Sequence, residues 1–162
     1  MSRRLVPDAS DLGRRTEVRV VQEVGGQFRF LDHTGDLAME CFGRDFPELL
    51  VSGAKGMFYA IAEEELPGSP AERRAEVAGD SPSILFHSWL KELLFVYDTE
   101  RFLPAEYEVQ VADLSQACGR LKGQTVSDEV MLPGPIKAVT YHGLKVEKQA
   151  DGVWRAYVVF DT

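Results

Sequence analysis

Apolar and polar residues alternate with a period of two where the regular pattern of the chain begins. Residues 17–22 and 27–31 both show this alternation, and Gly25 and Gly26 lie between them. Such alternation is typical of a half-buried strand, and a glycine pair between two alternating runs is typical of a hairpin. Residues 37–42 predict another short strand, so we expect residues 32–36 to form a polar connection between strands.

The spacing then changes to that of helices. Asp45, followed by Pro47 and Glu48, is an N-terminal capping pattern and predicts that a helix begins here. Its apolar positions form one stripe, which consists of Phe46, Leu49, Leu50, Ala54, Met57, Phe58 and Ile61. The acidic, proline-containing residues 63–70 predict an exposed loop, because blocks of like charge repel. Ser81 and Pro82 open a second, more apolar helix that continues to Val96.

Alternation with a period of two returns in the last third of the chain. It predicts strands within residues 107–111, 118–123, 136–147 and 153–160, with a hairpin turn at Asp151 and Gly152. A short strand is also expected near residues 76–78. The order of elements predicts an α+β fold: a two-layer domain in which a mainly antiparallel or mixed β-sheet packs with two main α-helices.

The arginine-bearing residues 1–16 lack a sustained apolar period, so we expect a flexible arm there and a single domain over residues 17–162.

Composition and charge restrict the classes of function. The 162 residues are 44% hydrophobic, which suits one globular core, and the net charge of −8 excludes a general basic surface for wrapping nucleic acid. Two cysteines are too few for a disulfide-rich scaffold. The chain lacks the run of about 20 apolar residues that a spanning helix needs, and its start does not resemble a signal peptide. We therefore expect a cytoplasmic protein with no membrane partner.

Familiar catalytic motifs are missing, but one connection is rich in functional groups. The sequence contains no glycine-rich phosphate loop, no CxxC pair and no nucleophile elbow. Residues 32–36 place Asp32, His33, Thr34 and Asp36 close together. Two interpretations remain open from the residues alone: a connecting turn, which favours Asp, Thr and Gly, and a functional loop held by a scaffold.

The end of the chain offers a second group of carboxylates. Asp161 projects from the end of the last predicted strand, and the α-carboxylate of Thr162 lies one residue away. If Asp36 came close, three carboxylates would converge, and an all-oxygen cluster favours Mg²⁺, Ca²⁺ or Mn²⁺. The alternative is a frayed terminus with solvated charges.

Histidines provide the remaining candidates. His142 shares one face of a predicted strand with Thr140, and both an ordinary strand and a functional one fit that pattern. His87 lies within the apolar second helix, so we interpret it as structural.

Four of these segments together resemble the archease family. Residues 30–36 (FLDHTGD) resemble its F-x-D-H-T-A-D signature, residues 89–94 (WLKELL) its W-L-N-E-L-L helix, and residues 137–142 (KAVTYH) its K-A-V/I-T-Y-H strand. Trp154 with Phe160 and Asp161 resembles the end of the family pattern. The four motifs occur in the same order and spacing, and the resemblance covers roughly residues 26–162.

This resemblance implies a function in RNA joining. Archeases act with the GTP-dependent RNA ligase that joins 3′-phosphate or 2′,3′-cyclic-phosphate ends to 5′-hydroxyl ends in tRNA splicing and RNA repair. The expected role is that of an activator that promotes guanylylation and multiple turnover of the ligase. Such an activator is not itself an enzyme, has no catalytic residue of its own and reaches RNA only through its partner.

The family's metal ligands are carried over by motif to Asp36, Asp161 and Thr162, which would hold Ca²⁺, Mg²⁺ or Mn²⁺. Asp32, His33 and His142 are implied as neighbours of the metal or contacts to the ligase. Two residues depart from the family pattern: Gly35 replaces the usual alanine, which permits a positive φ, and Thr162 replaces an aliphatic residue.

Two other functions remain as alternatives. One is a stand-alone metal-dependent phosphohydrolase that uses the same carboxylates with His33 or His142 as base. The other is a chaperone-like RNA-processing adaptor.

Overall fold

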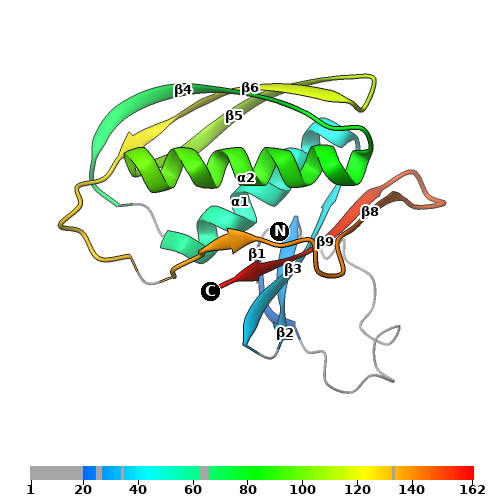
Figure 1. Ribbon diagram of the computed structural model, residues 1–162, viewed down its shortest axis with the longest axis horizontal. Helices are drawn as coiled ribbons and strands as arrows, with labels where there is room; N and C mark the ends of the chain where they lie inside the picture. The colour runs from blue at the N-terminus through cyan, green and yellow to red at the C-terminus, as the bar shows by residue number, and fades with distance from the viewer. Residues whose placement is uncertain (1–19, 25–26, 34, 63–65, 133) are drawn as a thin grey trace.

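Two antiparallel sheets enclose a pair of helices (Figure 1). The computed structural model describes residues 20–24, 27–33, 35–62, 66–132 and 134–162. The predicted arm at residues 1–16 lies outside this part of the chain. The elements are β1 (Val20–Val24), β2 (Phe28–His33), β3 (Asp36–Gly43), α1 (Phe46–Ala62), β4 (Ser69–Ala78), α2 (Pro82–Glu100), β5 (Phe102–Ala112), β6 (Gln116–Thr125), β7 (Ala138–Val139), β8 (Lys145–Lys148) and β9 (Trp154–Asp161). The predicted α+β class, with two helices and antiparallel strands, is confirmed.

The first sheet joins the two ends of the described chain. Its strand order is β1-β2-β3-β9-β7, and β8 also pairs with β9. Every pairing in it is antiparallel. Because β3 pairs with β9, the end of the chain lies beside a strand that forms near its beginning.

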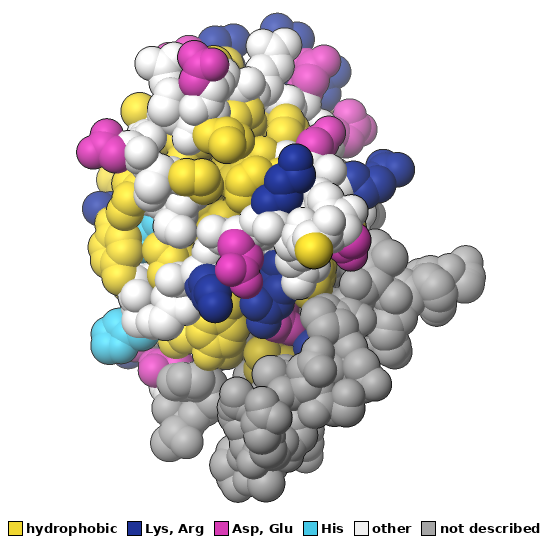
Figure 2. Space-filling model, turned by 90° about the vertical axis from the view of Figure 1, so that its right-hand side faces the viewer, with side chains coloured by type: hydrophobic (Ala, Val, Ile, Leu, Met, Phe, Trp, Pro, Cys, Tyr) yellow, Lys and Arg dark blue, Asp and Glu magenta, His cyan; other side chains and the backbone are white. Residues whose placement is uncertain are grey.

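The second sheet has the order β4-β6-β5 and lies across the helices from the first (Figure 1). Its outward face carries charges of both signs: Arg120 lies between Glu72 and Glu108, at 3.5 Å and 3.7 Å. Acidic and basic side chains are also interspersed on the face of the molecule shown in Figure 2. This mixture agrees with the exclusion of a general basic surface.

Both helices begin where the capping residues predict. The Asp45 Oδ1 accepts a hydrogen bond from the backbone N–H of Glu48 at 2.9 Å, and the Ser81 Oγ accepts one from Ile84 at 3.2 Å. These bonds satisfy amide groups that have no partner within the helix. α2 ends at Glu100, and Arg101, its C-cap residue, has a left-handed φ of 56°.

The main core fills the space between the helices and the two sheets. Trp89 of α2 is fully buried and donates its indole N–H to the Leu50 carbonyl of α1 at 2.9 Å, which ties the helices together. The largest fully buried side chains are Trp89, Phe86, Phe102, Phe160, Met39, Leu49, Leu50, Met57, Ile61, Leu85, Leu90 and Leu93. Within the described residues, neither helix is long and apolar enough to cross a membrane.

Two sequence-based predictions are wrong in detail. The loop predicted for residues 63–70 ends earlier, because β4 begins at Ser69 and extends well beyond the short strand expected near residues 76–78. Only the end of β4 was expected, because its less exposed positions are Ala71, Arg73, Ala75 and Val77, of which only Val77 is a branched apolar residue, while charged residues dominate its other face. The other error concerns residues 136–147.

Residues 136–147 do not form the one continuous strand that was predicted. They contribute to two short strands, β7 and β8, which are separated by a turn. The Thr140 Oγ1 donates to the Val159 carbonyl at 2.8 Å and accepts from the His142 N–H at 3.1 Å. Gly143 then adopts a φ of 65°. His142 is thus in a turn, and Thr140 and His142 do not share one face of a strand. The turn predicted at Asp151 and Gly152 is confirmed, since Gly152 donates its N–H to the Gln149 carbonyl at 2.9 Å between β8 and β9.

Candidate functional site

The motif at residues 32–36 forms a tight hairpin rather than a separate polar connection. β2 continues to His33 and β3 starts at Asp36, and these two residues are register partners. Gly35 lies in the hairpin turn with a φ of 74°, as its replacement of alanine permits. The side chains of Asp32 and His33 lie outside the described part of the structure, but their backbones belong to β2, where Asp32 is the register partner of Leu37.

Asp36 and Asp161 lie directly opposite each other. They are register partners across β3 and β9, and Ala138 of β7 is the partner of Asp161 on the other side. Directly opposed residues of antiparallel strands share a face, with Cβ atoms about 4.5–5.5 Å apart. Residues separated by more than a hundred positions in the sequence therefore bring two carboxylates together at one corner of the sheet.

The end of the last strand is anchored by its neighbour. The backbone N–H of Lys137 donates to the Asp161 carbonyl at 2.7 Å, and β9 remains paired with β3 and β7 as far as Asp161. Because Asp161 is still paired on both sides, the end of β9 is ordered and does not form the frayed terminus considered as an alternative. Thr162 follows Asp161 directly and is exposed.

The chemistry of this corner suits a hard divalent cation. Opposed carboxylates repel each other, and no ion pair among the described residues involves Asp161. Carboxylate oxygens are the ligands preferred by Ca²⁺, Mg²⁺ and Mn²⁺. The described residues contain no cluster of three His, Cys, Asp or Glu side chains suited to a metal. A cation held by Asp36 and Asp161 would therefore need a further donor, and Thr162 follows Asp161 directly in the sequence.

A second apolar cluster lies next to this corner, on the face of the first sheet that points away from the helices. Leu31, Ala38 and Val159 are buried there, and Tyr157 packs against them. Burial and the nearby Glu40 carboxylate raise the pKa of Tyr157. The phenol therefore stays neutral at physiological pH.

Farther along the same face is a buried charge network that sequence reasoning missed. Glu40 is 1% exposed and Arg29 is 3% exposed, and the Arg29 Nη2 lies 2.6 Å from the Glu40 Oε1. Arg155 forms an ion pair with the other oxygen of Glu40. Charged residues at alternate strand positions predict a solvated face, so the sequence contained no sign that Arg29 and Glu40 would be buried, with the half-buried Arg155 beside them.

The remaining histidines have different environments. His142 is exposed in the turn between β7 and β8. His87 is buried, as its structural interpretation requires, and its Nε2 bonds to the Val139 carbonyl at 2.8 Å. Burial lowers the pKa of His87, and this effect exceeds the opposing effect of that hydrogen bond. The ring of Tyr141, which is 60% exposed, stacks on His87 at 3.8 Å between centroids, a contact that the pattern did not predict.

Known proteins share this fold and much of this sequence. The profile of the archease protein family matches residues 28–162. Protein archease of Archaeoglobus fulgidus is 36% identical over 137 residues, which cover 83% of this chain and 98% of the relative. The protein archease of Methanothermobacter thermautotrophicus is 29% identical, with 83% and 97% coverage. The solution structure of protein 1598 of Methanobacterium thermoautotrophicum superposes with a TM-score of 0.73 at 30% identity, covering 83% of this chain and 98% of that one. The chain belongs to the archease protein family.

Proposed function

We propose that this protein is an accessory factor that activates a GTP-dependent RNA ligase in tRNA splicing or RNA repair. Its membership of the archease family supports this role, because the match includes the motifs that carry the resemblance. The single observation that links the motifs to chemistry is the opposition of Asp36 and Asp161 across β3 and β9. The first and last motifs of the sequence thereby meet at one corner.

Asp36, Asp161 and the terminal carboxylate of Thr162 are the groups proposed to hold a divalent metal at this corner. Such a cation, when bound, supplies positive charge that offsets the charge of phosphate groups. The chain's own contribution is to hold the two carboxylates on paired strands, so that the site forms without rearrangement of the sheet. The hydrogen bond from Lys137 to the Asp161 carbonyl fixes the end of β9 at the same point.

The proposed division of labour agrees with the charge of the protein. With a net charge of −8, this chain is poorly suited to grip RNA over a broad surface, whereas its partner has to bind RNA. An acidic accessory protein and a basic ligase attract each other, which raises their rate of encounter. We propose that the metal corner faces the ligase active site in the complex.

An assay of ligase guanylylation tests the proposal. A purified ligase of the 3′-phosphate/5′-hydroxyl class is incubated with GTP and Mn²⁺, with and without this protein, and the ligase–GMP adduct and the joined RNA are quantified. We expect the protein to accelerate adduct formation, and Asp36→Ala and Asp161→Ala to abolish the stimulation. Glu108→Ala, which removes an exposed carboxylate from the second sheet, is the matched control and retains the stimulation.

The alternatives predict different results in the same experiment. A phosphohydrolase would cleave GTP or RNA without the ligase, and that activity would contradict the accessory role. An adaptor that only recruits the ligase would remain active after loss of either aspartate. Failure of the wild-type protein to stimulate its cognate ligase would also overturn the proposal.

A further inference from the structure

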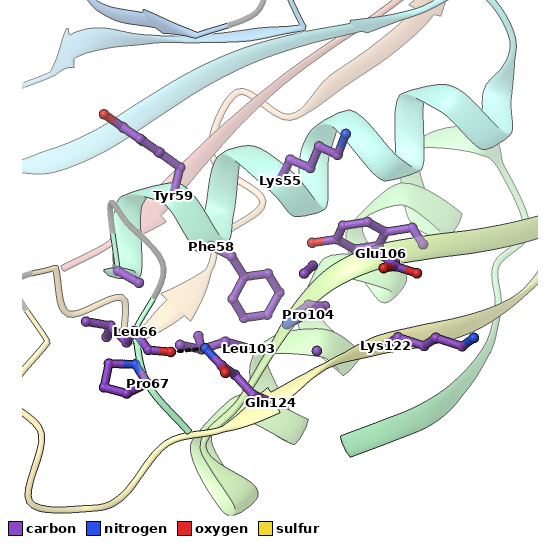
Figure 3. Close-up of a pocket in the computed structure, with 14 residues that line it drawn as sticks. Lys55, Phe58, Tyr59, Leu66, Pro67, Leu103, Pro104, Glu106, Lys122 and Gln124 are labelled. Carbon is purple, nitrogen blue, oxygen red and sulfur yellow. Dashed lines mark hydrogen bonds between the residues drawn. The ribbon is translucent and has the colours of Figure 1, made fainter. Parts of the chain in front are cut away.

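A cleft opens between α1 and the second sheet, and the proposed function makes no use of it. Its volume is about 730 Å³, and its walls come from α1, from the segment at Leu66 and Pro67, and from β5 and β6 (Figure 3). Pockets of about 300–1,000 Å³ are the usual size for small organic ligands. The metal corner belongs to the first sheet, so this cleft is made from different elements.

The floor of the cleft is apolar. In Figure 3, Phe58 points from α1 toward Leu103 and Pro104 of β5. Leu66 closes one end, held by a hydrogen bond from the Gln124 side-chain amide to its carbonyl. Phe58 is 7% exposed and Leu103 is 9% exposed, so both present only a part of their surface to the cleft. An apolar body of limited size fits such a floor.

Tyr107 contributes an unused polar group. It lines the cleft, and its hydroxyl oxygen is buried without a hydrogen-bond partner in the described structure. Burial raises the pKa of Tyr107, so the phenol remains neutral and able to donate. A buried hydroxyl without a partner is unfavourable, and a ligand oxygen that accepts a hydrogen bond from it would remove that cost.

The charge of the lining favours an anion. Lys55 of α1 and Lys122 of β6 line the cleft with Glu106, which leaves one positive charge in excess. Both lysines are exposed, and neither forms an ion pair within the described ranges. A locally positive cleft is unusual on a chain whose net charge is −8.

We propose that this cleft binds a small organic anion whose apolar body packs on Phe58 and Pro104. Its carboxylate or phosphate group lies within reach of Lys55 and Lys122 at the rim. An oxygen of the ligand accepts the hydrogen bond of the Tyr107 hydroxyl. The three kinds of contact together distinguish this ligand from a free inorganic anion and from a neutral apolar molecule.

Titration of the full chain by two-dimensional NMR tests the site. The probes are phenyl phosphate and phenylacetate, with benzyl alcohol as the neutral counterpart and inorganic phosphate as the anion without an apolar body. We expect saturable shifts at residues that line the cleft, with affinity for an anionic probe about tenfold above that of either control. Saturation by either anion supports the site, and the tighter of the two identifies the anionic group that it takes.

Three variants separate binding from folding. The double variant Lys55→Ala/Lys122→Ala is expected to weaken anion binding about tenfold, while Lys91→Ala, on the exposed side of α2, leaves it unchanged. Tyr107→Phe should weaken binding several-fold without lowering the melting temperature, because it removes a buried hydroxyl that has no partner. The proposal is overturned if neither anion saturates, if the shifts lie outside the cleft, or if the lysine variant binds as tightly as the wild type.

Discussion

Asp36 and Asp161 face each other across β3 and β9, at the corner where the hairpin motif meets the end of the chain. Like charges directly opposed on a sheet destabilise it, so this arrangement opposes folding unless something neutralises it. We therefore predict that divalent cations stabilise the folded protein through this corner. Unfolding measurements on the protein alone test this prediction.

We expect the effect of Asp161→Asn on stability to depend on divalent cations. When a chelator removes divalent cations, the variant should be more stable than the wild type by up to about 1 kcal/mol, because the repulsion between residue 161 and Asp36 is relieved. With Ca²⁺, Mg²⁺ or Mn²⁺ at 100 times its dissociation constant, the free energy of unfolding of the wild type should rise by about 2.7 kcal/mol. That of the variant should not change. Denaturant melts with and without each cation measure both effects.

Glu108→Gln serves as the control for this experiment, because it removes an exposed carboxylate of the second sheet. Its response to cations should match that of the wild type. Equal stabilisation of Asp161→Asn and the wild type by every cation would show that Asp161 is not a ligand.

Glu40→Gln should be among the most destabilising exchanges of one polar side chain for another. It leaves the guanidinium groups of Arg29 and Arg155 without their shared carboxylate, and Arg29 is 3% exposed. Removing one partner from a buried ion pair costs about 3–5 kcal/mol. Urea denaturation of the variant and the wild type gives the difference directly.

The matched comparison is Glu108→Gln, which breaks an Arg–Glu pair whose glutamate is 72% exposed. Exposed pairs contribute about 0–1 kcal/mol, so this variant should stay close to the wild type. Similar losses for the two variants would mean that burial does not determine the contribution of the Glu40 network.

The parts of the fold that the sequence predicted are those with strong local patterns. Asp45 and Ser81 were recognisable as caps because capping depends on residues within one helical turn. The turn at Asp151 and Gly152 was recognisable because turn chemistry is equally local. β4 was mostly missed because Ala71, Arg73 and Ala75 line its partly buried face, and such residues do not show the usual apolar alternation.

The site was only partly predictable for the same physical reason. Asp36 and Asp161 could be named as candidates, but their opposition depends on the register of β3 against β9, which no local pattern contains. The network of Glu40 with Arg29 and Arg155 depends on three strands and on burial of a face that looks polar in the sequence. The division of residues 136–147 into two strands depends on the Thr140 hydroxyl, whose bonds join positions that are not adjacent.

Gly35→Ala should destabilise the hairpin between β2 and β3 through the backbone alone. Gly35 has a φ of 74°, and a Cβ atom added there would meet nothing within 4 Å. A left-handed conformation costs an L-residue about 1–2 kcal/mol. We therefore expect the free energy of unfolding, measured by chemical denaturation, to fall by that amount. Gly35→Asn should lower the free energy of unfolding less than Gly35→Ala does, because asparagine tolerates this conformation better than alanine. If alanine is tolerated as well as asparagine, the hairpin adopts another φ in the variant.

His87 should make the protein less stable in mild acid. Burial lowers its pKa in the folded state, and the nearby Lys91 lowers it further. As the pH falls below about 6.5, the ordinary pKa of histidine, the unfolded chain binds a proton that the folded chain does not. The contribution of His87 to the free energy of unfolding is therefore fully present above this pH and is lost progressively below it, down to the pKa of the folded state.

The measurement is the free energy of unfolding from urea titrations between about pH 7.5 and 5. His87→Gln should remove part of the loss on acidification, so that its curve converges toward that of the wild type as the pH falls. His142→Gln, which alters an exposed histidine in the turn after β7, should leave the slope of the wild type unchanged. Parallel curves for His87→Gln and the wild type would show that His87 accepts its proton as readily in the folded protein as in the unfolded chain. The stacked Tyr141 and the bond to Val139 would then stabilise both protonation states equally.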